Sequence, residues 1–103
     1  MLCFMTHRRL KPGSFEAFRK AWEPDEMPPG LRERAFHVRS LSDPNEIVSF
    51  GLADMAVEDL PAFRDAHGGA EAEARRQERM APYVEWTGID GIFEVVEELV
   101  VGE

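Results

Sequence analysis

Three histidines are the side chains in this sequence best suited to acid–base chemistry, because imidazole changes its charge near neutral pH. They are His7, His37 and His67, and long stretches of chain separate them. None of them stands at metal-binding spacing from another histidine or from Cys3, the single cysteine. The chain also lacks a glycine-rich nucleotide loop. We therefore expect neither a metal ion nor a cofactor.

His67 is the best candidate for a general base. It follows Leu60 and Phe63 at helical spacing, so we expect all three on the inward stripe of one helix. A neutral imidazole in that place could accept a proton from a phenol. The alternative is a structural histidine that precedes Gly68 and bonds the last carbonyls of its helix.

Four further side chains are predicted to line a pocket for a small apolar or aromatic ligand. They are Phe63, His37, Arg39 and Trp86. His37 and Arg39 share the mixed face of one predicted strand, where they could instead form hydrogen bonds across a dimer interface. Trp86 could close one end of the pocket, or it could be an ordinary core residue.

Composition excludes several classes of partner. The chain has 103 residues and a formal net charge of −8, and we treat residues 1–103 as a single domain. The negative charge repels phosphate backbones, so nucleic acid is not an expected partner. The apolar runs are shorter than the ~20 residues of a spanning helix, so we expect no membrane association and a cytoplasmic location.

Changes in hydrophobic periodicity divide the chain into alternating elements. Strands are predicted over residues 1–7, 34–41, 47–54 and 92–101, and helices over residues 14–22, 57–67 and 70–81. Ser14 is a suitable cap for the first helix, and Pro61 is compatible with the second only in its first turn. Prolines indicate a loop over residues 24–30. The charged side chains of residues 71–79 are expected to form a solvated helix face, with Glu71 and Arg75 as an ion pair.

This order of elements predicts a ferredoxin-like α+β fold, βαββαβ, with a four-stranded antiparallel sheet and the helices on one face. Three of the four predicted strands are apolar on both sides. In residues 47–53, for example, Val48, Phe50 and Leu52 alternate with Ile47 and small uncharged residues. Strands of this kind belong in a sheet that is covered on both faces. Since the helices cover only one face, we expect a second copy of the chain to cover the other and form a homodimer.

The chain resembles the dimeric α+β barrel superfamily, and within it the antibiotic-biosynthesis-monooxygenase-like proteins. The resemblance covers the whole order of elements. In residues it consists of Phe4-Met5 leading to His7-Arg8, the Asp43-Pro44-Asn45-Glu46 hairpin before Val48-Ser49-Phe50, the Leu60, Phe63, His67 helix, and Phe93-Glu94-Val95-Val96. It implies a fold that hosts several unrelated activities.

The resemblance implies a cofactor-independent monooxygenase-like enzyme acting on a phenolic or polycyclic small molecule, with His67 and His7 as catalytic candidates. The alternative is a non-catalytic dimeric protein for ligand binding or stress response. A haem-degrading oxygenase is disfavoured. The positions at which haem-degrading relatives carry asparagine, tryptophan and the iron-ligating histidine correspond here to His7, Phe63 and roughly Glu73.

Overall fold

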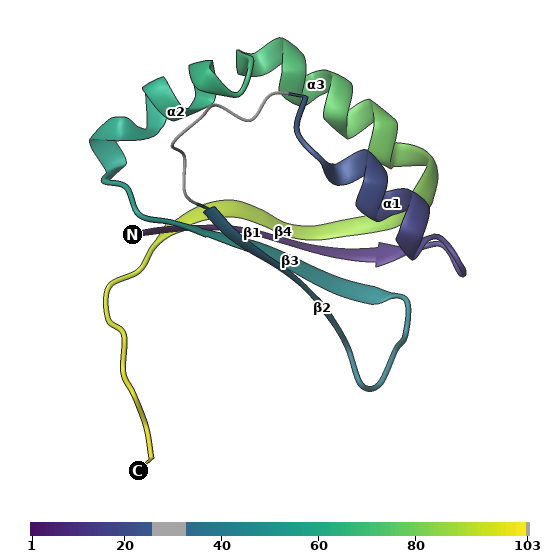
Figure 1. Ribbon diagram of the computed structural model, residues 1–103. Coiled ribbons are helices and arrows are strands. Elements are labelled where there is room, and N and C mark those ends of the chain that lie inside the picture. Colours follow the sequence, from purple (N-terminus) through teal and green to yellow (C-terminus); the bar gives the residue numbers. More distant parts are fainter. Residues whose placement is uncertain (26–32, 103) are drawn as a thin grey trace.

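A computed structural model describes residues 1–25 and 33–102 of the chain. Its strands are β1 (Leu2–Leu10), β2 (Glu33–Arg39), β3 (Glu46–Ala53) and β4 (Val84–Glu94). Its α-helices are α1 (Phe15–Trp22), α2 (Leu60–Ala66) and α3 (Gly69–Met80), with the short 3-10 turns η1 (Val57–Asp59) and η2 (Ala81–Tyr83). The strands form one antiparallel sheet in the order β2-β3-β1-β4, and the helices lie over one of its faces (Figure 1). The predicted ferredoxin-like α+β fold is confirmed.

The last strand was predicted in the wrong place. β4 begins at Val84 and ends at Glu94, whereas the apolar pattern indicated residues 92–101. The pairing of β4 with β1 ends where Glu94 lies opposite Leu2. One further backbone hydrogen bond joins the Val95 N–H to the Met1 carbonyl. Residues 95–102 then leave the body of the protein as an extended arm (Figure 1).

Alternation along β1 decides which side chains face the helices. Phe4 stacks on Phe63 of α2, Arg8 lies over Phe18 of α1, and Leu10 is buried with Phe18. Even-numbered residues of β1 therefore point toward the helices and odd-numbered residues toward the opposite face. Because His7 is odd-numbered, it points away from the helical layer.

Local signals explain most of the helix boundaries. Pro61 lies in the first turn of α2, as predicted. Backbone N–H groups in the first turn of a helix make no hydrogen bond within the helix, so a proline there removes none. Gly68 and Gly69 have positive φ angles of 91° and 70° and separate α2 from α3. Ser14 precedes α1, but its side chain makes no capping hydrogen bond; only its carbonyl accepts the N–H of Phe18.

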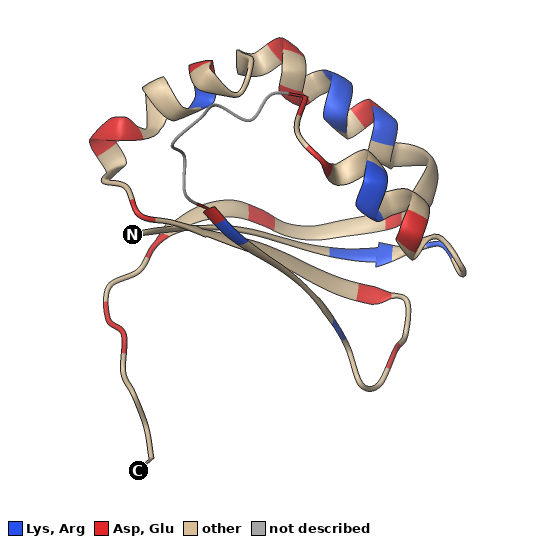
Figure 2. Cartoon of the chain, viewed as in Figure 1, with Lys and Arg blue, Asp and Glu red and all other residues tan. Residues whose placement is uncertain are grey.

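The main hydrophobic core occupies one end of the space between helices and sheet. Leu10, Phe18, Ile47 and Met80 are all fully buried there. Phe18 docks α1 onto the sheet, and Met80 does the same for the end of α3. Figure 2 shows that charged residues follow the outer turns of α1 and α3, as expected for helices with one solvated face.

The charged surface differs from the prediction in one detail. Arg75 does not pair with Glu71. Its Nε lies 3.2 Å from Asp25 Oδ2, and Arg79 donates to the other oxygen of the same carboxylate at 2.7 Å. Asp25 thus joins the segment after α1 to α3. The rest of the loop predicted over residues 24–30 lies outside the described residues.

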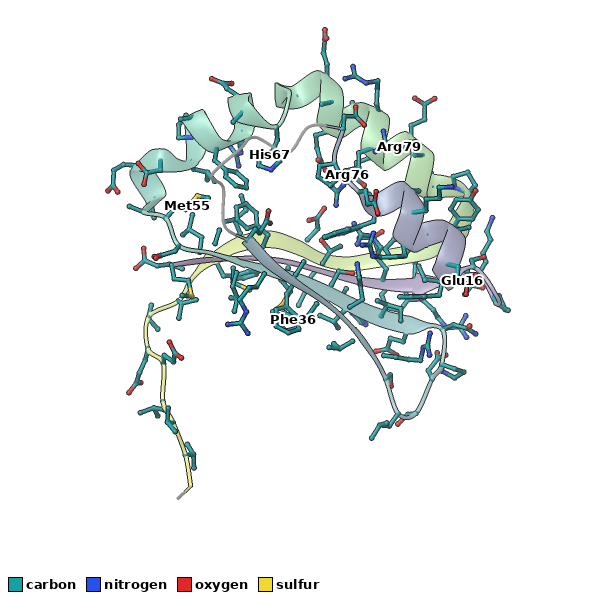
Figure 3. The ribbon with its side chains drawn as sticks, viewed as in Figure 1. Glu16, Phe36, Met55, His67, Arg76 and Arg79 are labelled. Carbon is teal, nitrogen blue, oxygen red and sulfur yellow. The ribbon has the colours of Figure 1, made fainter. Side chains whose placement is uncertain are left out.

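The opposite face of the sheet carries large apolar side chains that no element of residues 1–25 and 33–102 covers. Phe36 of β2 stacks on Phe50 of β3 with ring centroids 4.9 Å apart, and Figure 3 shows Phe36 on the side away from the helices. Val38 lies two residues after Phe36 on β2 and therefore on the same face of the sheet. Both side chains are exposed, and Trp86 and Phe93 of β4 are exposed as well. We call this surface the open face.

No helix in the described part of the chain has the length and apolar character needed to cross a lipid bilayer.

Candidate functional site

A cavity of about 960 Å³ lies between the sheet and the helices, beside the packed core. Phe4, Thr6 and Arg8 of β1 contribute to its floor, and residues of α2 and α3 contribute to its walls. The lining is mainly apolar, with a few polar groups. A cavity of this size and composition suits a small, largely apolar molecule.

His67 follows α2 and lines this cavity. Its Nδ1 lies 2.9 Å from the carbonyl oxygen of Phe63 near the end of α2, which is the contact expected of the structural alternative for this histidine. A carbonyl oxygen can only accept a hydrogen bond. Nδ1 must therefore carry the proton, and Nε2 of the neutral ring must carry the free electron pair. Nε2 is buried and has no hydrogen-bond partner within the described residues. The ring is thus held as a base directed inward from α2 (Figure 3).

Aromatic rings surround this end of the cavity. The Phe63 and His67 ring centroids are 4.3 Å apart, and Phe63 in turn stacks on Phe4 at 5.2 Å. Two flat rings next to a base provide a surface on which a planar aromatic molecule can stack.

Arg8 lies on the floor farther along β1. Its residue surface is only 3% exposed, and its guanidinium lies 5.3 Å from the centroid of Phe18. One terminal nitrogen, Nη1, is buried without a hydrogen-bond partner in the described part of the chain. Burial is the main cause that lowers the pKa of Arg8, and the charge of Arg76 lowers it further.

Arg76 of α3 lines the cavity on the helix side. The prediction that the charged side chains of residues 71–79 are all solvated is therefore wrong for this residue. The side chain is 17% exposed and packs its guanidinium over Trp22 at 5.2 Å. Its Nε donates to the Trp22 carbonyl at 2.6 Å, and its Nη1 donates to Glu73 at 3.0 Å. These bonds hold α1 and α3 together and fix one wall of the cavity.

His37 and Arg39 of β2 do not line the cavity. His37 lies at the packed end, with its Nδ1 2.8 Å from Ser49 Oγ and its ring edge-on to those of Phe18 and Trp22. Burial lowers the pKa of His37, with further lowering by Arg19, Arg8 and Arg76. Arg39 is exposed and lies over the ring of Phe15.

His7 and Trp86 lie on the open face, on the other side of the sheet from the cavity. Their rings meet edge to face with centroids 4.9 Å apart, and His7 Nε2 lies 2.9 Å from Glu46 Oε1. Trp86 therefore does not close the cavity, and His7 cannot act together with His67 within one subunit. The physical reason is strand alternation: residues 7 and 8 of β1 point to opposite faces.

Of the six residues selected from the sequence, the structure brings only Phe63 and His67 together in the cavity. Sequence reasoning missed Arg8 and Arg76. A signal was present for Arg8, because a charged residue between Thr6 and Leu10 on the inward alternation of an apolar strand must be buried.

Comparison with known proteins identifies the fold. No family model matches the chain, and no curated protein matches it. A proposed antibiotic biosynthesis monooxygenase from Chloroflexus aurantiacus J-10-fl superimposes with a TM-score of 0.63 at 16% identity, over 98% of both chains. An uncharacterized NIPSNAP domain protein from Burkholderia xenovorans gives 0.60 at 20% identity, covering 98% of this chain and 100% of that one. A proposed antibiotic biosynthesis monooxygenase from Nitrosomonas europaea gives 0.57 at 18% identity, covering 92% and 89%.

The chain is therefore a small ferredoxin-like α+β protein with the fold of antibiotic-biosynthesis-monooxygenase-like and NIPSNAP domain proteins. Identities this low establish the fold and leave the activity to be argued from the site.

The residue at the expected position of the iron ligand does not suit haem, so a haem site would need His67 as the ligand instead. Glu73, which stands near the position of the iron ligand in haem-degrading relatives, accepts hydrogen bonds from Arg76 and Gln77. Within the described residues no group of three His, Cys, Asp or Glu side chains could hold a metal ion.

Proposed function

We propose that this protein is a cofactor-independent monooxygenase-like enzyme that acts on a phenolic or polycyclic small molecule held in the helix–sheet cavity. The observation that supports this most directly is the orientation of His67. Its Nδ1 is occupied by the Phe63 carbonyl, which leaves the basic Nε2 buried and without a hydrogen-bond partner among the described residues, beside the cavity that His67 lines. The monooxygenase names of two structures with the same fold agree with this proposal.

The proposed reaction needs only a base, a dry site and dioxygen. Nε2 of His67 removes a proton from the substrate, and the resulting anion is electron-rich enough to reduce dioxygen. For an anthrone, the central CH2 carbon loses two hydrogens and becomes a carbonyl with one oxygen of dioxygen. The other oxygen leaves with those two hydrogens as water. Phe4 and Phe63 would hold the planar substrate and keep water from the reactive anion.

The test is oxidation of anthrone to anthraquinone, followed by quinone absorbance and oxygen consumption. Replacing His67 with glutamine keeps a polar side chain but removes the base, so kcat should fall by about 10²- to 10⁴-fold. The matched control is His7→Gln, because His7 lies on the open face and should leave turnover nearly unchanged. A rate that does not depend on His67, or on the protein at all, would remove the catalytic proposal.

A non-catalytic ligand-binding protein is the second candidate, and one feature favours it. Catalytic histidines are commonly oriented by a carboxylate, whereas the partner of His67 Nδ1 is a backbone carbonyl. If this candidate is correct, a planar aromatic ligand binds in the cavity, and its affinity depends on Phe4 and Phe63 while no product forms.

We also infer that the protein works as a homodimer in which two open faces pack together. Phe36, Val38, Trp86 and Phe93 would otherwise remain in contact with water. The arm of residues 95–102 supports the same inference, since Val96 is 88% exposed and Val100 92% exposed. A second copy of the chain is an occupant that could cover both surfaces.

A further inference from the structure

We propose that the cavity selects an aromatic ligand that carries a permanent carboxylate, and that Arg8 binds this carboxylate. The inference rests on the proposed function for the location of the ligand and adds its chemical class. It predicts an anion site at one end of the cavity and the base His67 at the other.

The first argument is the unmet hydrogen-bonding capacity of Arg8. A guanidinium group has five N–H donors and stays charged in proteins. Arg8 is only 3% exposed, and its Nη1 is buried without a hydrogen-bond partner within residues 1–25 and 33–102. An ionic group buried in this way costs free energy unless a partner arrives.

The second argument is that the nearby carboxylates are already engaged elsewhere. Glu73 accepts hydrogen bonds from Arg76 and Gln77, and Asp90 accepts one from the Thr6 hydroxyl at 3.1 Å. None of the ion pairs in the described part of the chain includes Arg8. Burial lowers the pKa of Arg8 and the charges of Asp90 and Glu73 raise it, but these carboxylates form no ion pair with it in the described part of the chain, so its guanidinium can still pair with an anion that enters the cavity.

The third argument is that packing alone would favour an apolar residue in this position. Arg8 contacts the ring of Phe18, and the next inward residue of the strand, Leu10, belongs to the hydrophobic core. An apolar side chain of similar length would avoid the cost of burying a charge. A destabilising charge that lines a cavity is typical of a binding site.

The geometry also limits the ligand. Phe4 marks the His67 end of the cavity, and it precedes Arg8 by four residues of β1, or about 13 Å along the strand. A fused-ring molecule can span this length with its carboxylate on Arg8 and its acidic proton near His67. Glu73 and Asp90 also line the cavity and would repel a doubly charged group, so a carboxylate fits better than a phosphate.

The experiment compares two non-reacting probes of nearly equal shape, 2-naphthoate and its neutral amide, 2-naphthamide. Isothermal titration calorimetry on the full chain should show naphthoate binding roughly tenfold tighter or more, the range of a charge-assisted hydrogen bond. The location can be read from the two tryptophans of the chain by NMR. The indole N–H of Trp22, which lines the cavity, should shift on binding, while that of Trp86 should not.

Three variants assign the site. In Arg8→Met the two probes should bind with about equal affinity, and the melting temperature should be unchanged or higher. If Arg8 had only a structural role, the substitution would lower the melting temperature. Arg8→Lys keeps the charge and should retain part of the preference. Lys20→Met is the control, because it removes the same charge at an exposed position outside the cavity lining, and it should bind like the natural protein.

Equal affinity for the two probes, a preference that survives in Arg8→Met, or loss of folding in that variant would each overturn the proposal. Equal losses in Arg8→Met and Lys20→Met would also overturn it, because they would indicate a general charge effect. None of these measurements involves turnover. A protein that binds naphthoate through Arg8 but does not oxidise anthrone would refute only the proposed reaction.

Discussion

At the scale of single residues, three histidines with the same intrinsic chemistry have three different surroundings. His67 has its proton fixed by a carbonyl and its base directed into a cavity, while His37 is enclosed by aromatic rings. His7 is bridged to Glu46 on the open face. Helical spacing was sufficient to indicate His67. Sequence could not distinguish the other two, because their roles depend on which face of the sheet each strand presents.

The surroundings of His37 predict a pH dependence of stability. Burial lowers its pKa in the folded state, so the unfolded chain binds a proton more readily than the folded protein does. The contribution of neutral His37 is present above the ordinary histidine pKa of about 6.5 and is lost as the pH falls below it. The positive charges of Arg19, Arg8 and Arg76 add to the penalty for protonation.

The measurement is the urea midpoint of unfolding at pH 7.5 and pH 5.5. Carboxylates also titrate over this range, so the informative quantity is the difference between the natural protein and His37→Gln. The natural protein should lose more stability on acidification than the variant. Parallel losses in both proteins would show that His37 does not contribute.

Arg8 was not among the candidate site residues because it was not considered as a buried cavity residue. The residues considered from the sequence were those with a recognised catalytic or ligand role, whereas the informative feature of Arg8 is its position among apolar neighbours. The predicted strand stopped at residue 7, whereas β1 continues to Leu10, so the alternation from Thr6 through Arg8 to Leu10 was not followed. The signal that the sequence did contain was a charged side chain at a position expected to be buried.

At the scale of elements, hydrophobic periodicity predicted most of the fold. The strands with clear alternation, β1 and β3, and the helices with apolar stripes were found close to their observed places. β4 was missed because Glu85, Gly88 and Asp90 interrupt its pattern, as an edge strand permits. The arm was taken for a strand because its apolar residues alternate, although it pairs with no strand in the described part of the chain.

The docking of α1 gives a prediction about an element. Phe18 has no exposed surface and joins α1 to Leu10 and Ile47 of the sheet. Phe18→Ala should lower the free energy of unfolding by about 3–5 kcal/mol, because it removes a buried ring and leaves a cavity. Chemical denaturation checks this value. Lys20→Ala is the control on the exposed side of the same helix and should change stability by less than about 0.5 kcal/mol; a similar small change in Phe18→Ala would contradict the packing account.

At the scale of the whole molecule, the helices cover one face of the sheet only in part, and no described element covers the other face. The helical face is packed at one end and hollow at the other, which leaves room for a ligand. The open face has no cover in the described residues, although it carries the large apolar side chains of Phe36, Val38, Trp86 and Phe93. The same sheet thus supplies the floor of the cavity and the proposed dimer interface, so the two functions share one set of strands.

The assembly is tested by placing a charge on the open face. Phe36→Glu should separate the homodimer, because its carboxylate would be buried beside Phe50 when two open faces pack together. Sedimentation velocity at micromolar concentration should give a dimer for the natural protein and a monomer, or a dimer weakened by at least about 100-fold, for the variant. Ala17→Glu introduces the same charge on the exposed side of α1 and should remain dimeric. Circular dichroism separates dissociation from unfolding. A natural protein that sediments as a compact, folded monomer would contradict the interface, and the open face would then be a stable surface of one subunit.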